Sequence, residues 1–409
     1  MNVEITPKKL AGTVAPPSSK SMTHRAILAA ALSQGTSTLR NVSFSQDIRA
    51  TLDCVTGLGC HWEEPEPGVL SVQGIWGREW DPAGLSVFDC GESGSTLRFL
   101  LPVVLALEGG GQFTGRGRLM ERPQKPYFDL FLERGIHYEQ VDNILTVQGE
   151  LEPGEFSLPG DVSSQFVTGL LYALHFMERD SRILLTTPLE SAGYVRMTLE
   201  VLSAFGVEIE NRGFREFLVP GEQFCQARDL TMEGDWSQAA FWYAAKALGS
   251  PVEIAGLRED SSQGDRVVRD LFPRLCREEG EVELDLSGCP DLLPPLAVMA
   301  AGRQGITRFT GAARLRLKES DRLATVHGLL SALGCPSEEG PDSLLVYGGK
   351  PLSGGVVDGA GDHRIVMAAA IAATACQGPV TILGAGAVEK SYPAFWQDYK
   401  ELGGEVHVL

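Results

Sequence analysis

The sequence lacks the features that mark several large protein classes. Its eight cysteines include no C-x-x-C pair, which favours reduced thiols over disulfides or a zinc site. No apolar run is long enough to span a membrane, and the opening MNVEITPKKL has no signal-peptide core, so we expect a cytoplasmic protein. Neither G-x-x-x-x-G-K-[ST] nor a helix-opening G-x-G-x-x-G occurs, which argues against a nucleotide-phosphate enzyme.

Basic residues are few relative to acidic ones. The chain has 35 Lys and Arg against 53 Asp and Glu, and its formal net charge is −18. Nucleic acids and anionic membranes require a broad basic face, so neither is expected as a partner. A small anionic ligand held by a local basic cluster is still compatible with this balance. The 409 residues are enough for two or more domains, each with its own core.

The chain also contains an internal repeat. Six segments open with Gly, Asp or Ser and continue as a mostly apolar helical run: 19–32, 91–107, 160–174, 234–248, 288–301 and 361–374. Each is followed by an extended segment and most by a second, amphipathic helix that ends at Gly, such as 47–59, 127–135, 194–206 and 319–334. The spacing of about 70 residues is that of a small subdomain rather than a solenoid unit.

These units predict a β-α-β-α-β-β repeat that occurs six times, in an α/β protein. If the six leading helices pack in two groups of three, their N-termini can point toward the same space between two lobes. Free backbone N–H groups and the helix dipole attract anions to such ends. We therefore expect an anion-binding cleft between the lobes.

The stretch from Pro16 to Leu32 combines a helix start with basic side chains. Ser18 and Ser19 can cap the helix, and Lys20 and Arg25 add positive charge to its N-terminus. This arrangement predicts a phosphate or carboxylate site. A capped helix with two solvated basic residues fits the same stretch, and the stretch alone does not decide between them.

Polar and basic residues also occur at or near other predicted helix starts. In the first half these are the Gly-Ser-Thr turn of ESGSTLR, the basic loop GRGRLMERPQKP and the paired serines of GDVSSQ, which follow one another from residue 92 to residue 165. In the second half, Asp291 opens a helix and can act as a cap or as a general base. Cations recur nearby at Lys318, Arg322, Arg364 and Lys390.

Six motifs resemble those of the 5-enolpyruvylshikimate-3-phosphate synthase family. They are PSSKSMTHR, SGSTLR, GDVSSQF, KESDRL, GDHRIVMAAA and EKSYP, and they cover the whole chain in the family's order. The resemblance implies the two-lobed enolpyruvyl transferase fold, with three repeats in each lobe and the active site between the lobes. It places residues 1–17 and 233–409 in one lobe and residues 18–232 in the other. A monomer is expected.

The resemblance also implies an activity, namely transfer of the enolpyruvyl group of phosphoenolpyruvate to the 5-hydroxyl of shikimate 3-phosphate, with release of phosphate. It implies no metal or organic cofactor. The implied shikimate 3-phosphate residues are Ser21, Arg25, Ser163, Ser164, Ser191, Tyr194, Asp291 and Lys318. The implied phosphoenolpyruvate residues are Lys20, Gly94, Arg122, Gln165, Arg322, Arg364 and Lys390. Asp291 is the implied base for the hydroxyl, and Glu319 with Lys20 would move the proton at the methylene carbon.

Two positions depart from the family pattern, and two alternative functions stay open. Glu92 and Arg314 stand where the family pattern has Asn, so the contacts made there are not implied. The sister reaction on UDP-N-acetylglucosamine uses the same fold with a loop cysteine, but no cysteine lies between Cys90 and Cys225. A catalytically silent binding protein for an anionic metabolite is the other alternative, and Lys20, Asp291 and Glu319 argue against it.

Overall fold

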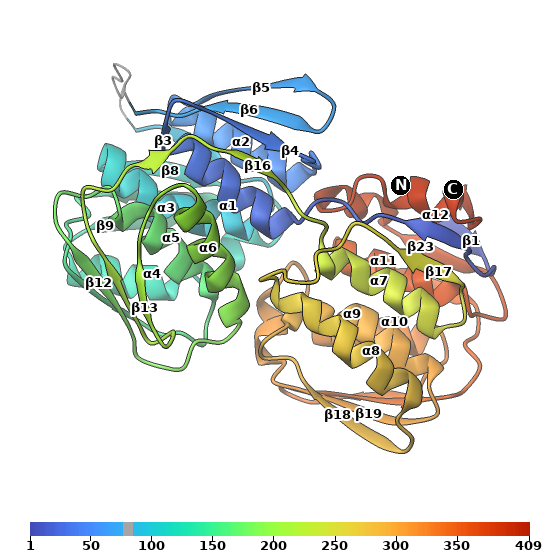
Figure 1. The fold of residues 1–409 in the computed structure, drawn as a ribbon. Coiled ribbons are helices and arrows are strands. Elements are labelled where there is room, and N and C mark those ends of the chain that lie inside the picture. The colour runs from blue at the N-terminus through green and yellow to red at the C-terminus, as the bar shows by residue number, and fades with distance from the viewer. Residues whose placement is uncertain (77–84) are drawn as a thin grey trace. The chain divides into compact units, whose positions relative to one another are not determined.

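The computed structural model describes residues 1–76 and 85–409, which form two compact units (Figure 1). The terminal unit contains Met1–Ser19 and Glu233–Leu409, and the central unit contains Lys20–Met232. The chain therefore passes between the units twice. Beside these two passages, Ser18 and Gly234 form an antiparallel bridge, and the Ser19 N–H donates to the Glu233 carbonyl at 2.7 Å.

The described part of the central unit contains three four-stranded sheets, each accompanied by two helices. The first has the order β16-β4-β6-β5, the second β7-β8-β10-β9 and the third β11-β12-β14-β13. In each, the first two strands are parallel and the remaining neighbours are antiparallel. The helices are α1 Lys20–Ala31, α2 Gln46–Gly57, α3 Gly94–Glu108, α4 Lys125–Glu133, α5 Ser164–Leu174 and α6 Ala192–Ala204.

The strands of these sheets are short, and a strand from a distant part of the chain completes the first one. They are β4 Thr36–Arg40, β5 His61–Glu66, β6 Val69–Gln73, β7 Val87–Asp89, β8 Gly110–Thr114, β9 His137–Val141, β10 Ile144–Gln148, β11 Glu155–Leu158, β12 Ser181–Leu185, β13 Glu210–Arg212, β14 Glu216–Val219 and β16 Asp229–Thr231. Strand β16 pairs in parallel with β4 just before the chain leaves the unit. A small separate sheet joins β3 Ser33–Gln34 to β15 Cys225–Gln226.

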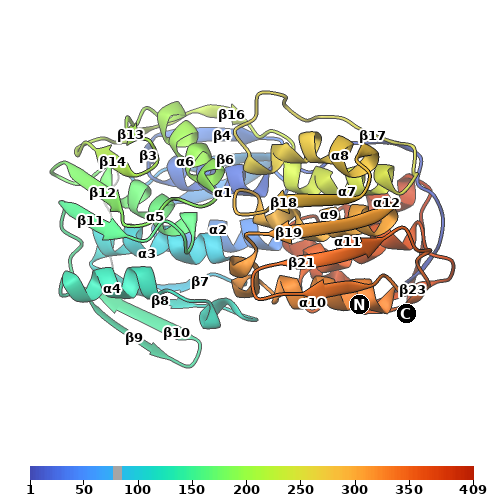
Figure 2. The same ribbon diagram turned by 90° about the horizontal axis from the view of Figure 1, so that it is seen from below.

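The terminal unit follows the same plan with one irregular repeat. Its four-stranded sheets have the orders β18-β19-β21-β20 and β22-β23-β1-β24, and Figure 2 shows β18, β19 and β21 side by side. In the repeat that begins near Gly234, the described strands β17 Val252–Ile254 and β2 Gly12–Val14 form a two-stranded sheet. The other strands are β1 Val3–Thr6, β18 Glu281–Asp285, β19 Gly305–Thr310, β20 Ser337–Glu339, β21 Leu344–Gly348, β22 Gly355–Asp358, β23 Val380–Leu383 and β24 Glu405–Val408.

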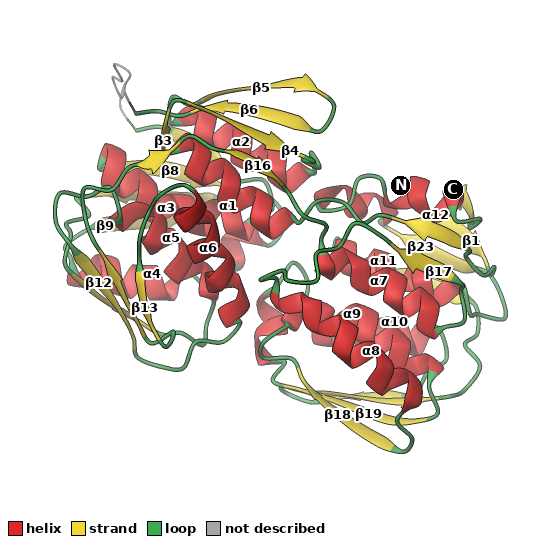
Figure 3. Ribbon diagram, viewed as in Figure 1, coloured by secondary structure: helices red, strands yellow, loops and turns green. Residues whose placement is uncertain are grey.

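In each unit, helices occupy the middle and sheets lie on the outside (Figure 3). The terminal-unit helices are α7 Trp236–Ala247, α8 Val268–Arg277, α9 Leu293–Gly302, α10 Arg322–Ala332, α11 His363–Ala373 and α12 Phe395–Glu401. The leading helix of each repeat is mostly buried: all residues of α11 and all but the last residue of α9 are buried. A helix that is apolar all round has to be buried, which is why these Ala- and Leu-rich runs form the cores. The six leading helices and the α/β class predicted from the repeat are confirmed.

Polar residues begin several of these buried helices. Ser93, Ser163, Asp235 and Asp362 accept backbone N–H groups at the starts of α3, α5, α7 and α11. A side-chain cap satisfies N–H groups that have no partner within the helix, so buried helices can start next to functional groups. Across residues 1–76 and 85–409, no helix combines the length and the apolar character that crossing a membrane requires.

Candidate active site

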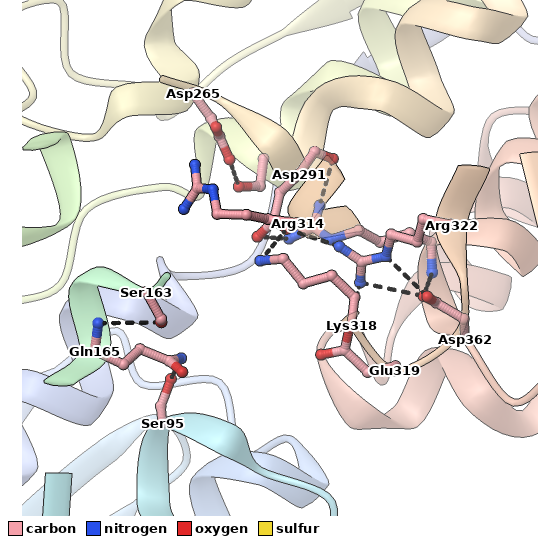
Figure 4. A network of polar contacts seen from close by, with 12 residues as sticks. Ser95, Ser163, Gln165, Asp265, Asp291, Arg314, Lys318, Glu319, Arg322 and Asp362 are labelled. Carbon is pink, nitrogen blue, oxygen red and sulfur yellow. Dashed lines mark hydrogen bonds and ion pairs between the residues drawn. The ribbon is translucent and has the colours of Figure 1, made fainter. Parts of the chain in front are cut away.

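In the terminal unit, three cations surround one carboxylate. Asp291 lies in the short 3₁₀ turn Pro290–Leu292 that precedes α9. Its Oδ1 accepts from Lys318 Nζ at 3.2 Å and from Arg322 Nη1 at 2.7 Å, and its Oδ2 accepts from Arg364 Nη2 at 3.1 Å. Lys318 and Arg322 come from the segment that leads into α10 and Arg364 from the start of α11, and Figure 4 shows Lys318 and Arg322 directed at Asp291.

Arg322 is the centre of this cluster. It begins α10 and is 1% exposed. Besides Asp291, it donates to Glu319 Oε2 at 2.7 Å and to Asp362 Oδ2 at 2.8 Å, and Ser320 donates to the same Asp362 oxygen at 3.0 Å. Because a guanidinium group has five donors in a fixed plane, one arginine can hold three carboxylates in set directions.

The pairing fixes the charge of the carboxylates. Burial alone raises the pKa of Asp291, but the charges of Arg364, Lys318 and Arg322 outweigh it and hold that pKa well below its ordinary value. Asp265, which accepts from Ser237, shows the opposite balance: burial and the nearby charge of Asp291 raise its pKa to about 6. The cluster therefore presents Asp291 as an ionised carboxylate, the form that a base requires.

The predicted site residue Lys390 and the departure Arg314 also lie in this unit. Lys390, in the 3₁₀ turn Ala385–Lys390, donates to the Gly361 carbonyl at 2.6 Å, next to the residues that begin α11. Arg314, which stands at a departure from the family pattern, donates through Nη2 to the Ser287 carbonyl at 2.7 Å. Arg314 is thereby attached to the loop that leads into Asp291.

In the central unit, Lys20 forms a short ion pair. It is the first residue of α1, and its Nζ lies 2.6 Å from Oδ2 of Asp47 in the first turn of α2. The two side chains are 17% and 9% exposed. The pairing between two adjacent helix starts sets the direction of the Lys20 side chain.

Arg25 is buried among neutral groups of the central unit. Its Nε donates to Thr198 Oγ1 at 2.9 Å, its Nη1 donates to the Ser21 carbonyl at 2.7 Å, and its guanidinium lies 5.1 Å from the centre of the Phe99 ring. Burial lowers its pKa to about 10, so it stays charged at neutral pH. Tyr194 belongs to the same neighbourhood, since its carbonyl accepts from Thr198 at 3.1 Å, and Ser191 precedes it at the start of α6 with a left-handed φ of 56°.

A second arginine orients the paired-serine motif. Arg98 Nη1 donates to Gln165 Oε1 at 2.8 Å and contacts Ser163 Oγ at 3.5 Å, while its guanidinium lies over the Phe166 ring at 4.7 Å. Gln165 Nε2 in turn donates to Ser95 Oγ at 2.9 Å (Figure 4). The amide is therefore held from both ends, and Ser164 begins α5 directly beside it.

Gly94 and Arg122 are in close contact. A Cβ added at Gly94 would lie 2.6 Å from Arg122 Nη1 and 2.9 Å from its Cζ, so the guanidinium packs against the bare α-carbon. Glu92, the other departure from the family pattern, is directed at Gly117, where an added Cβ would lie 2.5 Å from Glu92 Oε2. Its carboxylate therefore lies against the basic loop that follows β8.

Within each unit, the predicted residues gather at the starts of the buried helices. In the terminal unit, Asp291, Lys318, Glu319, Arg322 and Arg364 form one bonded cluster. In the central unit, the predicted residues divide among the Lys20, Arg25, Gln165 and Gly94 groups described above. The sequence reasoning missed Asp47, Arg98 and Asp362 as partners. The sequence did contain an indication for Arg98, because this residue lies four positions after Gly94 and therefore on the same helix face.

The arrangement of six buried-helix repeats in two units is that of the enolpyruvyl transferases. EPSP synthase from Acinetobacter baumannii superposes with a TM-score of 0.82 at 24% identity and covers 100% of both chains. The enolpyruvyl transferase NikO from Streptomyces tendae gives a TM-score of 0.78 at 18% identity and covers 99% of this chain and 98% of that one. At these identities the two structures establish the fold.

The sequence comparisons identify the family within this class. The profile of the family EPSP synthase (3-phosphoshikimate 1-carboxyvinyltransferase) matches residues 5–399. The 3-phosphoshikimate 1-carboxyvinyltransferase of Clostridium novyi is 43% identical over 98% of both chains, and that of Clostridioides difficile is 43% identical over 99% of this chain and 98% of the relative. The chain belongs to the EPSP synthase family.

Proposed function

We propose that the protein transfers the enolpyruvyl group of phosphoenolpyruvate to the 5-hydroxyl of shikimate 3-phosphate and releases phosphate. The observation that carries this proposal is Asp291 held by Lys318, Arg322 and Arg364, with Glu319 bonded to the same Arg322. A base, an acid and several cations are the groups that such a reaction on two anionic substrates requires. Family membership and the names of the relatives support this pair of substrates.

The reaction needs a proton to leave one substrate and a proton to reach the other. In our proposal, Asp291 accepts the proton of the 5-hydroxyl while the hydroxyl oxygen forms a bond to the central carbon of phosphoenolpyruvate. Glu319, with Lys20, protonates the methylene carbon. Because the product again carries a methylene group, that proton is removed as phosphate leaves. The cations stabilise the charge that develops during the addition.

The same cations can adjust Asp291 when substrate binds. Arg322 and Arg364 are proposed to bind phosphoenolpyruvate, and in the free protein both are bonded to Asp291. An arriving carboxylate or phosphate shares these donors, so the positive field at Asp291 falls. The pKa of Asp291 then rises from its low value in the free protein, which makes the carboxylate a stronger base at the moment of reaction.

The remaining sites are proposed residue by residue. Shikimate 3-phosphate is bound by Ser21, Arg25, Ser163, Ser164, Ser191, Tyr194, Asp291 and Lys318. Phosphoenolpyruvate is bound by Lys20, Gly94, Arg122, Gln165, Arg322, Arg364 and Lys390. The neutral hydrogen-bond partners of Arg25, the Thr198 hydroxyl and the Ser21 carbonyl, support this assignment for the central unit, because they orient the guanidinium group without cancelling its charge. We further propose a cytoplasmic monomer, which sedimentation of the purified protein would test.

Phosphate release with each substrate omitted in turn tests the proposal. We expect phosphate only when phosphoenolpyruvate and shikimate 3-phosphate are both present. Release with UDP-N-acetylglucosamine in place of shikimate 3-phosphate would instead support the sister reaction. Binding of both metabolites without any release of phosphate would support a silent relative.

A further inference from the structure

His24 begins a buried chain of hydrogen bonds that joins three helix starts. It lies on α1, one turn after Lys20. Its Nδ1 is 2.7 Å from Thr51 Oγ1 on α2, and Thr51 Oγ1 is 2.7 Å from Thr96 Oγ1 on α3. Thr96 Oγ1 then donates to Ser93 Oγ at 2.7 Å. All four side chains are at most 3% exposed.

Counting protons along this chain assigns the state of His24. A threonine hydroxyl has one proton, and Thr96 gives its proton to Ser93. The single proton of Thr51 therefore points to Thr96 at 2.7 Å, with the Asp47 carbonyl at 3.3 Å as a second, longer acceptor. With either acceptor the Thr51 proton is used, which leaves His24 Nδ1 to supply the proton to Thr51. His24 is thus a neutral imidazole with its hydrogen on Nδ1 and a bare lone pair on Nε2.

The surroundings of the ring agree with this assignment. Nε2 is fully buried, and no described residue forms a hydrogen bond with it. A proton on Nε2 would be a buried donor without an acceptor, which is costly. Burial, followed by the charges of Lys20 and Arg25, holds the pKa of His24 well below its ordinary value.

The chain ends at groups proposed to bind phosphoenolpyruvate. At one end, Ser93 caps α3 by accepting the Thr96 N–H at 3.2 Å, which shapes the turn where Gly94 meets Arg122. At the other end, the Thr51 hydroxyl lies 3.3 Å from the carbonyl of Asp47, the residue that pairs with Lys20. Lys20 and the Gly94 turn are thus connected through buried bonds.

We propose that His24 is a positioning residue that fixes Lys20 and the Gly94–Arg122 turn relative to each other through Thr51 and Thr96. The inference rests on the proposed function only in naming phosphoenolpyruvate as the ligand of these groups. Arg25 follows His24 directly but is held separately by Thr198 and Phe99. Loss of His24 therefore affects phosphoenolpyruvate more than shikimate 3-phosphate.

Steady-state kinetics of two substitutions test the role. In His24→Leu, which cannot donate, we expect the KM for phosphoenolpyruvate to rise about tenfold and the KM for shikimate 3-phosphate to change less than about twofold. His24→Asn can place its Nδ2 near the position of Nδ1 and should recover most of the loss. An unchanged KM for phosphoenolpyruvate, or equal effects of Leu and Asn, would overturn the proposal.

A near-isosteric break and a matched histidine serve as controls. Thr51→Val removes the next hydrogen bond of the chain. In the double variant with His24→Leu, the KM for phosphoenolpyruvate should rise no more than in the worse single variant, because both substitutions interrupt the same chain. His175→Asn alters another fully buried histidine of the same unit, outside the chain, and should leave the KM for phosphoenolpyruvate unchanged. Additive losses, or the same KM shift in His175→Asn, would contradict a specific role.

Nitrogen NMR of the imidazole tests the assignment independently of catalysis. With ¹⁵N-labelled histidine in the unliganded protein, the signals that disappear in His24→Asn should have the shifts of an Nδ1–H tautomer at neutral pH. An Nε2–H tautomer or a protonated ring would overturn the proposal even if the enzyme is active. If the wild type releases no phosphate while the Nδ1–H signals are found, the proposed function fails and the hydrogen-bond chain stands.

Discussion

The buried arginines of the two units have different kinds of hydrogen-bond partner. In the terminal unit, cations are bonded to carboxylates: Arg322 alone contacts Asp291, Glu319 and Asp362. In the central unit, Lys20 is also paired with a carboxylate, that of Asp47, but Arg25 and Arg98 are bonded to hydroxyl, amide and carbonyl oxygens and packed against aromatic rings. Opposite charges in the first cluster must exchange partners when an anion binds, whereas the guanidinium groups of the second keep their charge and position.

This contrast predicts where a charge change has the largest effect. Asp291→Asn keeps the size of the side chain and removes the base, so we expect kcat to fall at least about 1000-fold. Binding of shikimate 3-phosphate, measured by calorimetry, should weaken only modestly. Asp270→Asn, an exposed carboxylate on α8 of the same unit, is the matched control and should retain full turnover. Equal losses of turnover and binding would count against a base.

The next prediction compares one arginine from each unit. Arg322→Gln leaves Asp362 buried without its main partner and removes one of the three cations bonded to Asp291, so local stability should fall by about 3–5 kcal/mol. Arg98→Gln removes hydrogen bonds to neutral groups and should cost about 1–2 kcal/mol. Hydrogen exchange of the α11 and α3 amides reports the opening free energy of each unit separately. Equal losses of opening free energy in the two variants would contradict a difference between charged and neutral partners.

Acid should loosen the central unit first. His175 is buried and neutral, and burial lowers its pKa from the ordinary value of 6.5 to about 4. Below pH 6.5 this histidine becomes protonated in the unfolded chain but stays neutral in the folded unit. The free energy of unfolding therefore decreases as the pH falls, by roughly 3 kcal/mol near pH 4. In the terminal unit, Asp291 and Asp362 have lowered pKa values and keep their charges over this range.

Hydrogen exchange between pH 7 and pH 4 measures this difference. The amides of α5 should lose protection as the pH falls, and His175→Asn should reduce that dependence to the part that His24 contributes through its own lowered pKa. Terminal-unit amides that lose protection earlier than those of α5 would reverse the expected order.

The smallest effect is expected from one added methyl group. In Gly94→Ala, the Cβ would press on the Arg122 guanidinium at 2.6 Å, so the arginine must shift and the KM for phosphoenolpyruvate should rise about tenfold. Gly328→Ala, on α10, is the control, because its added Cβ meets nothing within 4 Å. An unchanged KM in the Gly94 variant would mean that Arg122 does not bind phosphoenolpyruvate from this position.

The sequence predicted the features that depend on local pattern. The buried leading helices follow from Ala- and Leu-rich runs behind capping residues, and the terminal-unit cluster was anticipated because KESDR places Lys318, Glu319 and Arg322 within one turn. The pairing of Lys20 with Asp47 and of Arg98 with Gln165 could not be predicted, since these partners lie 27 and 67 residues apart and meet only through helix packing. Strand β16, borrowed from residues 229–231, and the two-stranded β17–β2 sheet also depend on chain crossings that no local pattern shows.

Phosphorus NMR of a reaction mixture tests the central claim most directly. With phosphoenolpyruvate and shikimate 3-phosphate both present, the phosphoenolpyruvate signal should be replaced by inorganic phosphate, while the phosphate on shikimate stays esterified as an enolpyruvyl ether forms at its 5-hydroxyl. The account predicts no phosphate when either substrate is left out. Phosphate formed from phosphoenolpyruvate alone, or no reaction of the two substrates together, would contradict it.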